Sequence, residues 1–174
     1  SGDKVRLIAV SWSLNEKKGF DVYRWLDDNL DFDRYEMVFL GNSPVKFKNI
    51  KSIPPVDSNE VAQKFRDSDI YITGSQKDPC SNSLIEALNC GLPVVARNDG
   101  GHPEIIRTAG ELFDEARNIP GLLDKIAANP ENYFKNSSRP SIKEVGERYF
   151  DFAKLLMDAV KKGSYEPKNQ RSIK

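Results

Sequence analysis

The sequence has few of the residues on which common metal and hydrolase sites depend. Its 174 residues include one histidine, His102, and two cysteines, Cys80 and Cys90. A single histidine excludes a metal site built from several histidines, and no second one exists to complete a histidine-based hydrolase triad elsewhere. We interpret His102 as the start of a short helix opened by Pro103.

Net charge and long apolar runs are also missing. The 26 basic and 26 acidic residues cancel, so the chain has no electrostatic footprint for nucleic acid, and we expect small-molecule partners. No apolar run is long enough to cross a bilayer, and no signal peptide is visible. Cys80 and Cys90 flank one predicted helix, about 15 Å apart at 1.5 Å per residue, so a disulfide is excluded. Reduced thiols favour the cytoplasm, and a full-length protein could also be peripheral at a membrane.

Apolar runs and capping signals predict alternating strands and helices. Strands are expected at residues 5–10, 35–41, 50–53, 70–73, 93–96 and 111–113. Helices are expected from Gly19 to Leu30, from Asp57 or Ser58 to Asp67, from Ser83 to Gly91, after Pro103, at 119–129, and from Ser141 to Gly163. Residues 130–140 are expected to be irregular. This alternation predicts an α/β fold, a Rossmann-like parallel sheet with helices on both faces.

The most informative stretch runs from Ile70 to Ile106. An apolar strand ends at Gly74, a loop follows, and Ser83 with Glu86 matches the S-x-x-E signature of a helix start. After the next strand, Asn98 to Gly101 form a second loop. Because open α/β sheets bind ligands at the carboxyl ends of their strands, two such loops predict a cleft there. The chain has no G-x-G-x-x-G after its first strand, which argues against an ordinary NAD-binding domain.

This stretch resembles the C-terminal, donor-binding half of retaining GT-B glycosyltransferases of family 4. Their signature is an E-x7-E pair, whose second Glu opens EA-x-x-x-G-x-P-V-V, followed by G-G-x-x-E. The matching residues here are Glu86, Ala87, Gly91, Pro93, Val94, Val95, Gly100, Gly101 and Glu104. Asp78 stands eight positions before Glu86, where the family has its first Glu, and keeps a carboxylate on a shorter side chain.

The resemblance implies a role for each matching position. Asp78 would be the catalytic residue that holds a sugar hydroxyl, and Glu86 would bind the ribose. Lys18 matches the lysine of the family's G-R-L-x-x-x-K-G segment, which clamps the donor diphosphate, whereas Trp12-Ser13 stands where the arginine belongs. The other donor-binding residues would be Ser13, Asn15, Ile53, Ser81, Asn82, Ser83, Gly100 and Gly101, with Ile53 in the loop that lies over the base.

Simpler interpretations of these residues remain open. Glu86 could complete a capping box with Ser83, Lys18 could be a solvated lysine, and Gly100-Gly101 could form only a tight turn. The D-x-D sequences at residues 31–33 and 67–69 resemble metal-nucleotide motifs, but they do not follow strands, so we interpret them as surface or capping acids.

The function implied by the resemblance is transfer of a hexosyl group from a UDP- or GDP-sugar to an acceptor hydroxyl, with retention at the anomeric carbon. It needs no metal and no cofactor. We expect a donor-binding domain at residues 3–163 and a disordered tail at 164–174. An N-terminal acceptor-binding domain would be missing, so the isolated domain should be inactive. The alternatives are a stand-alone nucleotide-sugar-binding module without transferase activity and a sugar-nucleotide epimerase.

The last predicted helix carries an apolar stripe, and Ser141 with Glu144 forms a second S-x-x-E signature. The stripe comprises Val145, Tyr149, Phe152, Leu156 and Val160. We interpret it as core packing, although related enzymes often send their terminal helix across to the partner domain.

Overall fold

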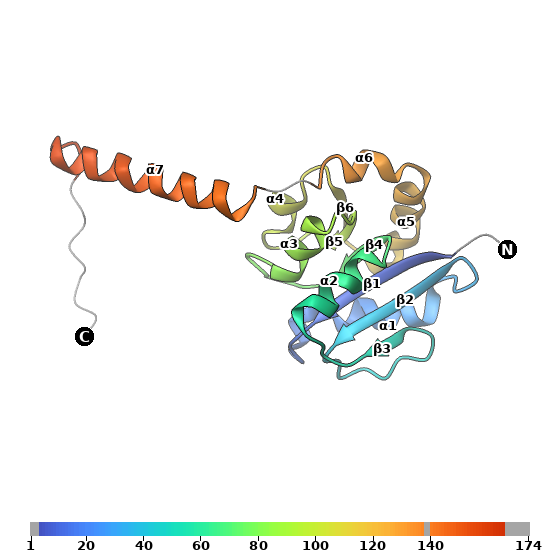
Figure 1. The fold of residues 1–174 in the computed structure, drawn as a ribbon. Coiled ribbons are helices and arrows are strands. Elements are labelled where there is room, and N and C mark those ends of the chain that lie inside the picture. The colour runs from blue at the N-terminus through green and yellow to red at the C-terminus, as the bar shows by residue number, and fades with distance from the viewer. Residues whose placement is uncertain (1–3, 138–139, 166–174) are drawn as a thin grey trace, which may run out of the picture. The chain divides into compact units, whose positions relative to one another are not determined.

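The computed structural model describes residues 4–137 and 140–165. These belong to two compact units, residues 1–138 and 139–174. The first unit contains a six-stranded sheet in which every neighbouring pair is parallel, in the order β3-β2-β1-β4-β5-β6 (Figure 1). The strands are β1 (Val5–Ser11), β2 (Tyr35–Gly41), β3 (Lys51–Ile53), β4 (Ile70–Thr73), β5 (Val94–Arg97) and β6 (Gly110–Phe113).

Helices cover both faces of this sheet, so the predicted Rossmann-like α/β fold is confirmed. On one face, α1 (Phe20–Asn29) and α5 (Ile119–Ala128) pack against alternate strand residues such as Leu7, Phe39 and Ile72. On the other face, α2 (Ser58–Arg66), α3 (Asn82–Asn89) and α4 (His102–Ile106) pack against the strand residues between them, such as Ile8 and Tyr71. Strands buried on both sides explain the continuous apolar runs in the sequence.

The strand order creates a topological switch point between β1 and β4. From β1 the chain builds outward to β2 and β3, and from β4 it builds in the opposite direction to β5 and β6. The loops that leave the carboxyl ends of β1 and β4 therefore diverge around a crevice, where open α/β sheets bind their ligands. The β1 loop contains η1 (Glu16–Lys18) and leads to α1, and the β4 loop leads to α3.

Two local predictions are wrong. The helix α3 begins at Asn82 with Ser81 as its N-cap, so Ser83 is not the capping residue of a box with Glu86. The hydroxyl of Ser83 instead lies 2.9 Å from that of Tyr71. The segment after Pro130 is not wholly irregular, because α6 (Pro130–Phe134) forms there, with the proline in the first turn, where no N–H donor is needed. A short η2 (Ala116–Asn118) precedes α5.

Several smaller predictions are confirmed. Both cysteines are free. The capping box of Ser141 and Glu144 is present at the start of α7 (Ile142–Lys161). Asp67 ends α2, and Asp69 binds Arg6 with a 2.7 Å ion pair, so the second D-x-D is structural.

The second unit consists mainly of α7, and no residue of this helix is buried. Tyr149 and Phe152 of its apolar stripe are 74% and 58% exposed, so the described residues of the second unit do not bury the stripe, and its core packing stays a prediction. Ser164 bonds back to Ala159 at the helix end, whereas residues 166–174 of the predicted tail lie outside the described residues. Within the described ranges, no helix has the length and apolar character needed to cross a membrane.

Candidate functional site at the sheet switch point

The loops after β1 and β4 contact each other directly through two glycines. Gly19 has a left-handed backbone, with φ of 79°, and a Cβ there would lie 2.2 Å from the carbonyl oxygen of Gly74. Only glycine fits such an approach, which explains the Lys18-Gly19 sequence. A hydrogen bond of 2.7 Å from the Gln76 N–H to the Lys17 carbonyl adds a second link. The two loops therefore form one rigid platform at the crevice.

The side chains of Tyr23 and Arg97 also fix the start of the β4 loop. The Gly74 N–H donates to the hydroxyl of Tyr23, and the Gly74 carbonyl accepts from Nε of Arg97 at 2.9 Å. Burial raises the pKa of Tyr23 to about 12, so its hydroxyl stays neutral. Arg97 also pairs with Asp21 on α1 at 2.7 Å. These contacts hold the loop that carries Asp78 against the first turn of α1.

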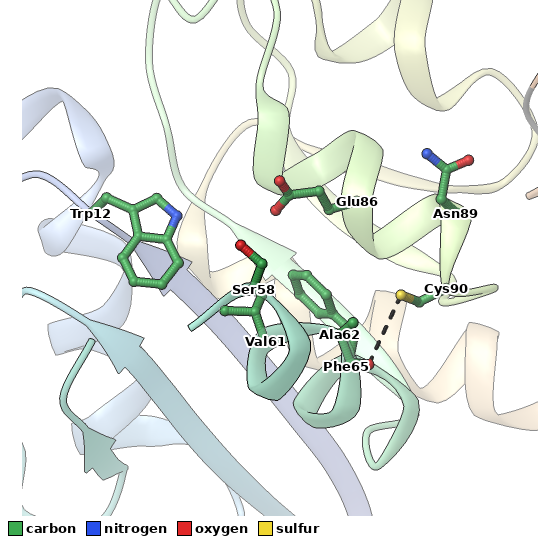
Figure 2. Close-up of a pocket in the computed structure, with 8 residues that line it drawn as sticks. All are labelled: Trp12, Ser58, Val61, Ala62, Phe65, Glu86, Asn89 and Cys90. Carbon is green, nitrogen blue, oxygen red and sulfur yellow. Dashed lines mark hydrogen bonds between the residues drawn. The ribbon is translucent and has the colours of Figure 1, made fainter. Parts of the chain in front are cut away.

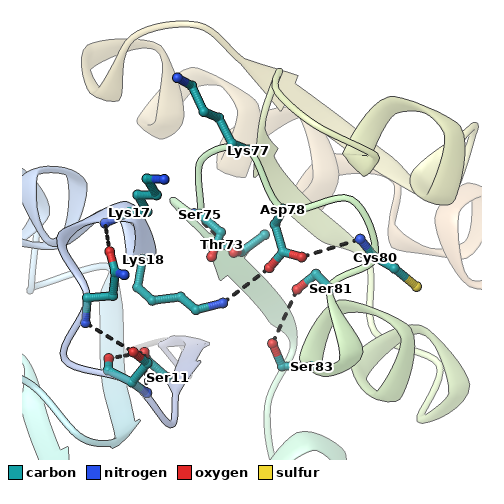
Figure 3. Close-up of polar contacts among 12 residues, drawn as sticks. Ser11, Lys17, Lys18, Thr73, Ser75, Lys77, Asp78, Cys80, Ser81 and Ser83 are labelled. Carbon is teal, nitrogen blue, oxygen red and sulfur yellow. Dashed lines mark hydrogen bonds and ion pairs between the residues drawn. The ribbon is translucent and has the colours of Figure 1, made fainter. Parts of the chain in front are cut away.

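Lys18 and Asp78 meet across this platform (Figure 3). The Nζ of Lys18 lies 3.2 Å from Oδ2 of Asp78, and the two side chains are 35% and 15% exposed. The other carboxylate oxygen of Asp78 accepts from the Cys80 N–H at 3.3 Å. The two residues predicted to hold the diphosphate and the sugar are thus brought together, as partners of each other.

Gly100 and Gly101 lie behind Asp78 and support its loop. A Cβ on Gly101 would lie 2.2 Å from the Pro79 carbonyl oxygen, and one on Gly100 would lie 2.5 Å from that of Asp78. The Gly101 N–H donates to the Asp78 carbonyl, and the Gly100 N–H donates to the carboxylate of Asp99. Both N–H groups are therefore engaged within the protein, and the visible role of the pair is to permit close approach to Asp78 and Pro79.

The N-terminus of α3 lies at the same edge of the sheet as these loops, at the carboxyl ends of the strands. Ser81, its N-cap, makes no side-chain capping bond, and its buried hydroxyl lies 3.5 Å from that of Ser83. The first N–H groups of a helix, here those of Asn82 and Ser83, have no intrahelical acceptors and carry the positive end of the helix dipole. Such an end favours an anionic group.

Glu86 borders a cavity of about 380 Å³ between α2, α3 and the β1 loop (Figure 2). We call it the Glu86 cavity; it is lined by Trp12, Ser58, Val61, Ala62, Phe65, Glu86, Asn89 and Cys90. The carboxylate of Glu86 points from α3 toward the side of the cavity where Trp12 stands. Burial raises the pKa of Glu86. With the capping box absent, the Glu86 side chain is not engaged at the helix end, and it borders the cavity instead.

A second, smaller hollow of about 250 Å³ lies over the platform. We call it the lysine cavity; it is lined by Ser13, Asn15, Lys17, Lys18, Gln76, Lys77, Asp78 and Pro79. The side chains of Ser13 and Asn15 also shape the β1 loop, because they accept from the N–H groups of Asn15 and Lys17. Four predicted site residues thus share this cavity.

Some predicted and unpredicted residues remain to be placed. Ile53 ends β3 and packs, half-buried, against the core cluster under α2 and α3. His102 begins α4 as expected and is buried, with Nδ1 2.9 Å from the Arg97 carbonyl. The sequence did not lead us to expect that Lys77 lines the lysine cavity or that Trp12 lines the Glu86 cavity. The sequence signal that could have indicated Lys77 is its position directly before Asp78.

The parallel sheet with its switch-point crevice defines the class as a Rossmann-like α/β domain, and comparisons with known proteins identify the family. Residues 6–139 match the family described as glycosyl transferases group 1, so the chain belongs to this family.

The structural matches have the GT-B glycosyltransferase fold. Sucrose-phosphate synthase from Thermosynechococcus elongatus superimposes with a TM-score of 0.71 at 15% identity, over 90% of this chain and 46% of that one. Alr3699/HepE from Anabaena, solved in complex with UDP and glucose, gives a TM-score of 0.64 at 16% identity, over 78% and 42% of the two chains. Sulfoquinovosyl transferase SQD2 from Arabidopsis thaliana is 29% identical over 98 residues, which are 52% of this chain and 19% of that protein. The chain therefore spans less than half of these relatives.

Proposed function

We propose that this chain is the C-terminal, donor-binding half of a retaining, family 4 glycosyltransferase that transfers a hexosyl group from a UDP- or GDP-sugar to an acceptor hydroxyl. The observation that carries the proposal is the meeting of Lys18 and Asp78 at the switch point, with Glu86 eight residues further on at a neighbouring cavity. The similar fold of a protein solved with UDP and glucose supports a nucleotide sugar as the ligand.

Each group has a chemical task in this proposal. Lys18 and the N-terminus of α3 bind the diphosphate and stabilise the negative charge that grows on it as it leaves. Asp78 accepts a hydrogen bond from a sugar hydroxyl and fixes the sugar beside the diphosphate. The carboxylate of Glu86 accepts from the two ribose hydroxyls, which places the ribose at the Glu86 cavity. The lysine cavity and the Glu86 cavity then hold different parts of one donor.

The cationic groups at the crevice make a bound metal unnecessary for holding the diphosphate. Within residues 4–137 and 140–165, no cluster of three or more His, Cys, Asp or Glu side chains is placed to hold a metal ion. The acceptor site belongs, in this proposal, to a partner domain, so the isolated chain binds the donor without transferring its sugar.

Calorimetry with UDP and with GDP, each with and without EDTA, tests the proposal. We expect weak binding of at least one nucleotide and the same affinity in the presence of EDTA. Binding that EDTA abolishes would reject the metal-free site, and a chain that binds neither nucleotide would reject the donor-binding role.

A further inference from the structure

The lysine cavity carries more positive charge than the ion pair of Lys18 and Asp78 needs. Three lysines and one aspartate line it, which leaves a net charge of two positive among the lining side chains. Since Lys18 is already paired with Asp78, the uncompensated charge comes from Lys17 and Lys77. Among the described residues, neither of these two lysines forms an ion pair within 4 Å.

Lys77 has an unusual backbone for a residue with a side chain. Its φ is 52°, one of two positive values among the described non-glycine residues. This left-handed conformation costs free energy for a residue with a Cβ and is comfortable for glycine. Strained residues of this kind concentrate at functional sites, which makes Lys77 a candidate ligand-binding residue.

The strain is held in place by two backbone hydrogen bonds, one from Gln76 and one from Lys77 itself. The preceding Gln76 N–H binds the Lys17 carbonyl at 2.7 Å, and the Lys77 N–H binds the carboxylate of Asp99 at 3.0 Å. Backbone hydrogen bonds from Lys77 and Gly100 lower the pKa of Asp99, so Asp99 remains a charged acceptor. The loop therefore carries Lys77 next to Asp78 in the chain on a fixed backbone, and without ligand the Lys77 side chain extends away from the ion pair of Lys18 and Asp78 (Figure 3).

Lys17 is the weaker candidate of the two. It also borders a separate groove that is lined by two carboxylates, of Glu16 and Asp21, as well as by Arg24. Lys77 is exposed and borders only the lysine cavity among the hollows described above, and its four-carbon side chain can turn toward a bound anion.

We propose that Lys77 is a second cationic ligand of the donor diphosphate, acting from the β4 loop opposite Lys18. The proposal rests on the proposed function, because it takes the diphosphate at the lysine cavity as given. It also explains how the site functions without the arginine that Trp12-Ser13 replaces in the β1 loop. The diphosphate would then be held between loops from both sides of the switch point.

The test compares Lys77→Gly, Lys77→Arg and a control, Lys64→Ala, in the 174-residue chain. Glycine removes the charge and accepts the left-handed backbone, so the loop should keep its conformation and the melting temperature should stay close to that of the wild type. Arginine keeps the charge. Lys64→Ala removes one charge from a partly buried side chain of α2, outside the residues that line either cavity. The ligands are UDP or GDP, the matching nucleoside, and inorganic pyrophosphate.

We expect Lys77→Gly to weaken nucleoside diphosphate and pyrophosphate binding about tenfold, as the loss of one charged hydrogen bond predicts. Nucleoside binding should not change, and the dependence of diphosphate affinity on salt should become shallower. Lys77→Arg and Lys64→Ala should both stay near the wild type. Two results would overturn the role of Lys77 and leave the proposed function standing. In the first, the wild type binds diphosphate and Lys77→Gly binds it equally well. In the second, Lys77→Gly loses nucleoside binding to the same extent as diphosphate binding. A wild type that binds none of these ligands overturns the proposed function and this proposal with it.

Discussion

The ammonium group of Lys18 lies 3.2 Å from the carboxylate of Asp78, although the residues are 60 positions apart. In our proposal, Lys18 holds the diphosphate and Asp78 holds the sugar. Without ligand, the two side chains form an ion pair with each other (Figure 3). A nucleoside diphosphate must therefore compete with Asp78 for Lys18. A nucleotide sugar offers a hydroxyl to Asp78 in return.

Asp78→Asn should consequently change the affinity for UDP and the extra affinity contributed by the sugar in opposite directions. Removing the competing carboxylate should tighten UDP binding about two- to fivefold, which matches the worth of a partly exposed ion pair of roughly 0.5–1 kcal/mol. The extra affinity that the sugar gives UDP-glucose over UDP should fall, because an amide is a weaker acceptor than a carboxylate. Calorimetry with both ligands gives the two values.

Lys18→Ala is the matched control, since it removes the other half of the same ion pair. It should weaken UDP binding by about 1.5–3 kcal/mol, the value of a charged hydrogen bond, and leave uridine binding unchanged. If Asp78→Asn weakened UDP as Lys18→Ala does, the pair would be a structural support of the loop and not a divided ligand site.

Gly101 should tolerate no side chain, and Gly121 provides the comparison. A Cβ on Gly101 would meet the Pro79 carbonyl oxygen at 2.2 Å, and a backbone atom cannot turn aside. Gly101→Ala should therefore cost about 1–3 kcal/mol of unfolding free energy through overpacking. Gly121 lies in α5 with no atom within 4 Å of its added Cβ, so Gly121→Ala should stabilise the helix by about 0.5–1 kcal/mol.

Urea denaturation of both glycine variants checks this contrast. Since Gly101 supports the loop that carries Asp78, its variant should also lose affinity for UDP-glucose, whereas Gly121→Ala should not. Equal stability of the two variants would contradict the close packing of the two loops.

The fold was predictable from the sequence because a strand that is buried on both faces of a sheet consists mainly of apolar residues. Tyr35–Gly41 and Ile70–Thr73 were predicted with the bounds that the structure has, from their mainly apolar residues. The S-x-x-E pattern was a less reliable sign of helix starts. At Ser141 the capping box exists. At Ser83 the helix begins one residue earlier, and the Ser83 hydroxyl is hydrogen-bonded to that of Tyr71 instead. A local pattern does not show which tertiary partner competes for a side chain.

The site was predictable one loop at a time and not as an arrangement. Lys18, Asp78 and Glu86 were each predicted from the resemblance of their own segment to the motifs of family 4. Their mutual contacts depend on Gly19 meeting Gly74 and Gly101 meeting Pro79, and such backbone approaches between distant segments leave no sequence pattern beyond the glycine itself. Lys77 was missed for a similar reason, because its strained backbone is visible only in the structure.

Glu86→Gln should separate ligand binding from folding. The capping box that would have made Glu86 structural is absent, so the melting temperature at neutral pH should not fall. Nucleotide affinity should fall by roughly 1–2 kcal/mol, the difference between charged and neutral hydrogen bonds. Wild type should discriminate against a 2′-deoxynucleotide, and the variant should lose most of that discrimination. Unaltered affinity and discrimination in the variant would remove Glu86 from the ribose site.

The pH dependence of donor binding should also depend on Glu86. Burial raises its pKa above the ordinary 4.5, which means that the folded, ligand-free protein holds this proton more firmly than the unfolded chain does. The contribution of Glu86 to stability is therefore fully present at low pH and is lost as pH rises through the folded-state pKa. Donor binding has the opposite sign, because a ribose diol needs the charged carboxylate.

Affinity for UDP-glucose should consequently fall as pH decreases through the raised pKa of Glu86, and the fall should begin at a higher pH than an exposed glutamate would give. UDP-glucose is the suitable ligand, because its diphosphate is esterified at both ends and does not titrate in this range. Calorimetry between neutral and mildly acidic pH should show this loss in the wild type and a flatter profile in Glu86→Gln. Parallel profiles for the two proteins would show that another group controls the acid limb and would separate Glu86 from the ribose contact.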